Sequence, residues 1–164
     1  MRNAFLSYQI FDFIAIFCPF YPTPQKIVAQ KPKTISSKEE FEVIKTHCMQ
    51  GANMLRRLEN FEDEPLLQTA YDIARWHHER WDGRGYPDGL KGNDIPISAQ
   101  IVSLADVYDA LTSERCYKKA SSHEIAMRMI LNGECGAFNP LLLECLTDIQ
   151  AELQEKSQNT AVSR

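Results

Sequence analysis

Apolar side chains recur at a helical period through most of the chain that follows Pro24. A first helix is predicted to begin near Ser37, because Ser37 and Glu40 have the spacing of a capping box. After a polar, acidic loop over 60–64, Pro65 suits the first position of a second helix, predicted over 66–79. The predicted buried face of the first helix consists of Phe41, Ile44, Cys48, Leu55 and Leu58.

Three further helices are predicted after a glycine-rich segment. Four glycines and a proline between positions 83 and 92 exclude a helix or a central strand, so a structured loop is expected there. The later helices are predicted over 98–111, with Ile101 buried, over 121–132, with Gly133 just beyond the end, and from Pro140, with Asn139 as N-cap and Ile149 buried. Because no alternating strand pattern occurs, the sequence predicts an all-α helical bundle.

The first 26 residues differ in character from the rest. Residues 4–21 are largely apolar and aromatic, but Gln9 and Asp12 interrupt them, and the run is short for a membrane span. Arg2 is the one positive residue before it, and no small-residue cleavage site follows. We interpret residues 1–26 as an atypical apolar segment, with a membrane or targeting role as the disfavoured alternative, 27–155 as one helical domain and 156–164 as a polar tail.

Composition narrows the class of protein. A length of 164 residues with 44% hydrophobic content suits one globular domain. The five cysteines are odd in number and scattered, which excludes a disulfide framework and favours a reducing, cytoplasmic setting. A net charge of -4 argues against a partner such as DNA, whose many phosphates need a basic stripe, but not against a small nucleotide.

Three histidines and an aspartate are candidate metal ligands. His77 and His78 lie at the end of a predicted helix, where such a pair alone is better explained by capping of the last carbonyls. Asp106 lies within an apolar helical stretch, where an unpaired carboxylate is costly; the alternative is a solvent-facing acidic pair with Asp109. His47 lies beside a mostly apolar helix face. Together these residues fit a divalent-metal site that polarises phosphoryl oxygens.

Arg115 and Lys118 follow the Asp106 helix and are candidate phosphate ligands. A guanidinium can bind a phosphate through two hydrogen bonds, and an ammonium adds a point charge beside it. The alternative for both residues is a solvated basic patch.

The residues from 77 to 92, which contain Gly85-Tyr86-Pro87, strongly resemble the signature of HD-GYP domains. Residues 105–118 and 41–47 are similar to the blocks that follow and precede that signature, and the likeness covers about 27–150. Members of this family are helical, metal-dependent phosphodiesterases that open the bacterial second messenger cyclic di-GMP to pGpG or GMP.

The resemblance implies a role for each candidate residue. The implied metal ligands are His47, His77, His78 and Asp106, with Asp106 also catalytic. Arg115 and Lys118 are expected to hold the phosphate of the substrate. The triplet Gly85, Tyr86 and Pro87 is expected to line the substrate cleft and to dock diguanylate cyclases. Imidazole and carboxylate ligands suit iron or manganese.

The chain departs from the family at the naming His-Asp dyad, because no His-Asp dipeptide occurs in the sequence. The register places Ile16 and Phe17 where the dyad belongs. Since the family's dyad aspartate bridges two metals, its loss is expected to impair the site. Three hypotheses follow: a phosphodiesterase with weak or absent activity, a non-catalytic module that binds the nucleotide or a cyclase, and a coding sequence in which a frameshift or wrong start replaced the N-terminal part.

Overall fold

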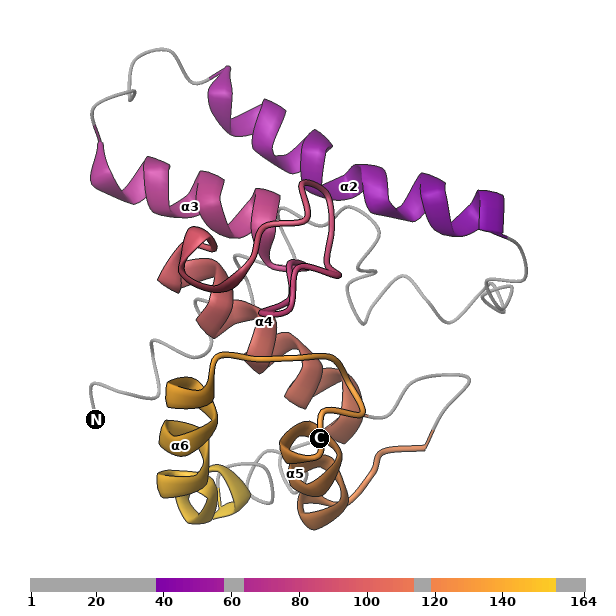
Figure 1. Ribbon diagram of the computed structural model, residues 1–164, viewed down its shortest axis with the longest axis vertical. Coiled ribbons are helices and arrows are strands. Elements are labelled where there is room, and N and C mark those ends of the chain that lie inside the picture. Colours follow the sequence, from indigo (N-terminus) through magenta and orange to yellow (C-terminus); the bar gives the residue numbers. More distant parts are fainter. Residues whose placement is uncertain (1–37, 58–63, 114–118, 156–164) are drawn as a thin grey trace.

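The computed structural model describes residues 38–57, 64–113 and 119–155. Within these ranges the chain is helical and contains no strand, which confirms the predicted all-α class (Figure 1). The elements are α2 (Lys38–Arg56), α3 (Pro65–Trp76), the 3₁₀ helix η3 (Gly92–Asp94), α4 (Ile97–Thr112), α5 (His123–Leu131) and α6 (Pro140–Asp148). None of the described helices is long and apolar enough to cross a bilayer.

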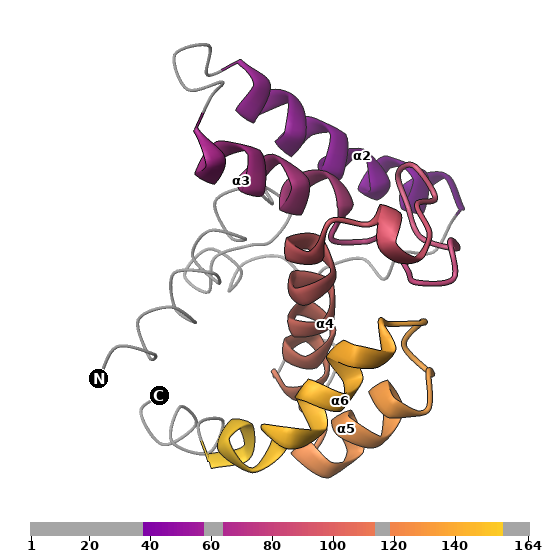
Figure 2. The same ribbon diagram turned by 60° about the vertical axis from the view of Figure 1, so that its left-hand side comes forward.

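The helices form two groups joined by α4. Helices α2 and α3 lie side by side at one end of the molecule, and α5 and α6 lie at the other end (Figures 1 and 2). Helix α4 packs against α3 and against α5, so it connects the two groups. The glycine-rich loop returns the chain from α3 to α4 and passes beside α2, where the ring of Tyr86 meets that of Phe41.

The two groups have cores of different size. Between α2 and α3 the core cluster is small, with Leu55, Ala70 and Ala74. Short side chains allow the two helices to approach closely and leave little apolar area to bury. The larger cluster joins α4, α5 and α6 and consists of Leu104, Leu111, Ala126, Met127, Ile130, Phe138 and Leu146.

Two helix boundaries agree with the prediction from the sequence, and two differ. Helix α6 begins at Pro140 with Asn139 as cap, whose side chain accepts from the Leu141 N–H at 3.0 Å, and Gly133 takes a φ of 72° beyond α5, as predicted. Helix α3 ends at Trp76, three residues before the predicted end. Helix α5 begins at His123 with Ser122 as cap, two residues after the predicted start at 121, and the Ser121 N–H donates to the Leu111 carbonyl at 2.9 Å.

Three residues predicted to be buried are exposed: Phe41 at 42%, Ile101 at 48% and Ile149 at 46%. Helix α4 turns Gln100 and Ser103 inward in place of Ile101. Gln100 bonds to the Ile95 carbonyl and to Asn139, and Ser103 accepts from Arg80. Ser37, Glu40 and Leu58, together with the predicted segments 1–26 and 156–164, lie outside the described residues or side chains.

Candidate metal centre

Helix α2 and the end of α3 bring three histidines together. His47 lies on α2, His77 is the C-cap of α3, and His78 is the next residue of the loop. One ligand atom from each, together with the Sγ of Cys48, lies within 4.8 Å of all the others. The rings of His77 and His78 have centroids 4.1 Å apart, and the His47 ring lies 5.3 and 5.0 Å from them. The structure therefore brings together His47, His77 and His78, as a shared metal site requires.

Backbone carbonyls orient two of the imidazoles. The Nδ1 of His47 lies 2.6 Å from the Ile44 carbonyl oxygen, and the Nδ1 of His77 lies 2.8 Å from that of Ile73. A carbonyl oxygen only accepts, so each Nδ1 carries the proton and each Nε2 presents its lone pair. The two Nε2 atoms face each other at 3.3 Å. Histidines that ligate metals are commonly held in this way, with the second ring nitrogen donating to a carbonyl.

Burial keeps two of these histidines neutral. His77 is 8% exposed, and its burial lowers the pKa to about 4, with electrostatic interactions with His47 and Arg80 adding to the shift. Burial, followed by electrostatic interactions with His77 and His47, lowers the pKa of His78 to about 2. The neutral imidazole is the form that binds a metal ion, so the site is ready for one at physiological pH.

The Gly85-Tyr86-Pro87 triplet lies against the histidines. The Tyr86 ring lies 4.8 Å from that of His78, and the Tyr86 N–H donates to the His78 carbonyl at 3.3 Å. Lys45 of α2 places its Nζ 4.9 Å from the Phe41 ring centre and 5.7 Å from that of Tyr86. An ammonium group and an aromatic ring thus lie beside the histidine cluster, an arrangement suited to a ligand with both phosphate and base.

Glu79 and Asp88 hold the loop in place. Glu79 is 2% exposed, and its Oε1 accepts from the backbone N–H groups of Asp88 at 2.8 Å and Gly89 at 3.0 Å. Asp88 accepts two hydrogen bonds from Arg75, at 2.7 and 2.9 Å, and a third from the Trp76 indole at 2.7 Å. These interactions lower the pKa of Asp88, chiefly through Arg75. The end of α3 is therefore tied to the loop that follows the histidines.

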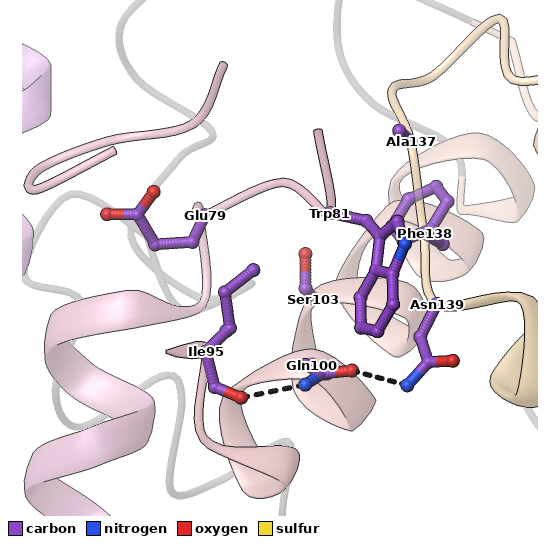
Figure 3. A pocket seen from close by; sticks show the side chains of 8 residues that line it. All are labelled: Glu79, Trp81, Ile95, Gln100, Ser103, Ala137, Phe138 and Asn139. Atoms are coloured by element: carbon purple, nitrogen blue, oxygen red, sulfur yellow. Dashed lines mark hydrogen bonds between the residues drawn. The ribbon is translucent and has the colours of Figure 1, made fainter. Parts of the chain in front are cut away.

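A small hollow lies beneath the loop, lined partly by Glu79, Trp81 and Ser103 (Figure 3). Gln100 bridges its floor, donating to the Ile95 carbonyl at 2.7 Å and accepting from Asn139 at 2.8 Å. The volume of the hollow is about 10 Å³, which is the space of about one water molecule. The hollow is therefore too small for a nucleotide.

The remaining predicted site residues lie elsewhere. Asp106 is half-buried on α4 and is not in the histidine group. Burial lowers the pKa of Arg80, and the charge of Asp106 opposes that shift. Its role as a metal ligand stays a prediction. Arg115 and Lys118 lie outside the described residues. Cys48 is the member of the group that the sequence did not suggest, because its position in the apolar repeat indicated a core residue; its place next to His47 was the available signal.

Comparison with known proteins gives one family. The HD domain matches residues 20–136. A probable cyclic di-GMP phosphodiesterase of Vibrio cholerae is 44% identical over 108 residues, 65% of this chain and 24% of that protein. A cyclic di-GMP phosphodiesterase of Thermotoga maritima is 39% identical over 132 residues, 77% of this chain and 35% of that protein.

A third relative differs in its substrate. The 3′3′-cGAMP-specific phosphodiesterase 2 of Vibrio cholerae is 36% identical over 121 residues, 74% of this chain and 22% of that protein. The chain thus spans between 22% and 35% of the length of these three relatives. The HD domain match covers most of the chain and includes both the paired histidines and the Gly85-Tyr86-Pro87 loop. The chain therefore belongs to the HD domain family, in its HD-GYP group.

Proposed function

We propose that this domain binds a divalent metal ion through His47, His77 and His78 and hydrolyses a phosphodiester bond of cyclic di-GMP. The observation that carries the proposal is the convergence of three buried or half-buried imidazoles on one point, two of them with Nδ1 held by backbone carbonyls. Relatives that are named as cyclic dinucleotide phosphodiesterases support the substrate class. The expected products are pGpG or GMP.

Each remaining candidate residue has a place in this proposal. A divalent metal, when bound, polarises a phosphoryl oxygen and lowers the pKa of water. Asp106 would be a further ligand and the catalytic carboxylate. Arg115 and Lys118 would offset the negative charge that develops on the phosphate in the transition state. Tyr86 and Pro87 would line the cleft for the nucleotide. Imidazole and carboxylate ligands favour iron or manganese.

The alternative is a non-catalytic module, and the absence of a His-Asp dipeptide from the sequence favours it. Such a module would bind cyclic di-GMP without turnover, or a diguanylate cyclase through the Gly85-Tyr86-Pro87 loop. Weak activity lies between the two readings, since one metal held by fewer ligands can still promote slow hydrolysis. The scattered cysteines favour a cytoplasmic location for either function, which cell fractionation tests.

Hydrolysis of cyclic di-GMP by the purified chain with Mn²⁺ or Fe²⁺ tests the proposal. We expect turnover that falls by at least on the order of 100-fold in His77→Gln and in Asp106→Ala, because a metal ion contributes several kcal/mol of transition-state stabilisation. His123→Gln is the matched control, since His123 lies on α5 and bonds to Tyr108 at 2.8 Å, away from the cluster. Parallel assays with 3′3′-cGAMP define the substrate.

Two outcomes would change the conclusion. Binding of cyclic di-GMP without turnover by a folded, metal-loaded chain, or co-purification with a cyclase, would replace hydrolysis with the non-catalytic module. Equal turnover in His77→Gln and in the unaltered chain would contradict a catalytic role for the histidine cluster.

A further inference from the structure

Cys48 contributes a sulfur atom to the histidine cluster. Its side chain is fully buried on α2, and its Sγ lies 3.5 Å from the Nε2 of His47. The same Sγ is one of the four atoms that lie within 4.8 Å of one another. The donors gathered here are therefore three nitrogens and one sulfur, whereas the carboxylate of Asp106 lies outside the group.

Packing alone does not explain this position. Buried cysteines often act as small apolar residues, and a thiol can donate one weak hydrogen bond. At this site, however, the Nε2 atoms of His47 and His77 both present lone pairs and face each other at 3.3 Å. One S–H group could donate to the Nε2 lone pair of His47, but the Nε2 lone pair of His77 would still face that of His47. A cation held between the Nε2 atoms of His47 and His77 and the Sγ of Cys48 would accept all three donors at once.

Two separations within the group agree with those around a four-coordinate ion. Two nitrogens about 2.05 Å from a tetrahedral zinc ion lie about 3.3 Å apart, and a nitrogen and a sulfur at about 2.05 and 2.3 Å lie about 3.6 Å apart. The observed separations are 3.3 Å between the two Nε2 atoms and 3.5 Å between Sγ and Nε2. Octahedral coordination at the same bond lengths would bring neighbouring nitrogens to about 2.9 Å.

We propose that Cys48 is a metal ligand, so that His47, Cys48, His77 and His78 form a four-coordinate nitrogen–sulfur site. This inference rests on the proposed metal site and specifies its ligands. A thiolate ligand favours Zn²⁺ or Fe²⁺ over Mn²⁺, which prefers oxygen. On metal binding the thiol proton would leave to solvent, and the thiolate would supply the negative charge that the carboxylate of a His-Asp dyad would otherwise provide.

Cobalt spectroscopy of the full chain tests the ligand. Co²⁺ is added without oxygen to metal-depleted protein that is kept reduced by a phosphine. We expect an equimolar amount to produce the intense visible bands of tetrahedral Co²⁺ and a near-ultraviolet sulfur-to-cobalt charge-transfer band, and Zn²⁺ to displace both. The charge-transfer band should disappear in Cys48→Ser. It should persist in the matched control Cys145→Ser, whose thiol is exposed on α6.

Cobalt that binds with no charge-transfer band, or with a band that persists in Cys48→Ser, overturns the cysteine ligand and leaves the proposed phosphodiesterase intact. No cobalt bound overturns both proposals. A band that depends on Cys48, in a chain that does not hydrolyse cyclic di-GMP, upholds the ligand and rejects the hydrolase.

A second measurement covers the case in which Cys48→Ser does not fold. X-ray absorption at the zinc edge of the unaltered, zinc-loaded chain should show a sulfur neighbour at about 2.3 Å. A shell of nitrogen and oxygen alone would overturn the proposal.

Discussion

At the scale of single residues, Glu79 shows how tertiary structure reassigns a side chain. The helical pattern predicted Glu79 as the last residue of a helix, yet it lies in the loop and accepts from two backbone N–H groups there. Its Oε2 is buried and has no hydrogen-bond partner among the described residues. Burial therefore raises the pKa of Glu79, although the backbone donors oppose the shift. One carboxylate oxygen holds the loop, and the other is desolvated at a cost.

Replacing Glu79 tests this division between its two oxygens. Glu79→Ala removes the acceptor of two backbone N–H groups, so we expect the free energy of unfolding to fall by about 2–3 kcal/mol through the loss of two hydrogen bonds to a carboxylate. Glu79→Gln keeps one acceptor oxygen and removes the desolvated charge, so we expect a change of less than about 1 kcal/mol. Urea unfolding of the three proteins measures both values. An equal cost for the two substitutions would show that the charge, and not the acceptor, matters.

At the scale of elements, the glycine-rich loop depends on close backbone approach. A Cβ atom at Gly85 would meet the Glu79 Cα and Arg80 N, and would lie 2.6 Å from the Glu79 carbonyl carbon. These contacts are to backbone, which cannot rotate away. The loop can therefore fold back onto the end of α3, and place Tyr86 against His78, only if position 85 has no side chain.

Alanine substitutions separate this effect from ordinary backbone strain. We expect Gly85→Ala to lower the free energy of unfolding by more than about 2 kcal/mol, because the loop must move away from Glu79. Gly92→Ala is the matched control: its φ is 58°, but nothing lies within 4 Å of its added Cβ. That strain alone should cost about 1–2 kcal/mol. Thermal unfolding ranks the two, and a smaller effect at position 85 would contradict the close approach.

At the scale of the whole molecule, the candidate site lies in the half with the smaller core. The cluster between α2 and α3 has three buried apolar residues, and the interior of the same half also contains His47 and His77. Neutral imidazoles are tolerated there, whereas charged ones would be desolvated without a counter-ion. The stability of the metal-free protein should therefore depend on pH through these histidines.

Stability of the metal-free chain should fall as the pH falls below 6.5. Burial lowers the pKa of His77 to about 4 and that of His78 to about 2, so the unfolded chain, with pKa near 6.5, binds protons first. Stability is complete above 6.5 and is lost progressively toward pH 4. Between about pH 7.5 and 5.5 we expect a loss of about 1 kcal/mol for each of the two residues.

Urea unfolding at the two pH values measures this loss. His77→Gln cannot take up a proton at position 77, so its loss should be about half as large. A loss that is the same in His77→Gln and in the unaltered chain would contradict the assignment to this histidine.

Sequence by itself determined the helical class, the cap of α6 and the candidate histidines, because these depend on local periodicity, on short-range hydrogen bonds and on residue chemistry. The tertiary structure alone decided that Phe41 and Ile101 are exposed and that α3 ends before its histidines. It also decided that the buried Cys48 lies beside the three histidines. Helical period shows which residues share a face, but what packs on that face is set by residues far away in the chain. Cys48 and His77 are brought together by the packing of α2 on α3, which no local pattern records.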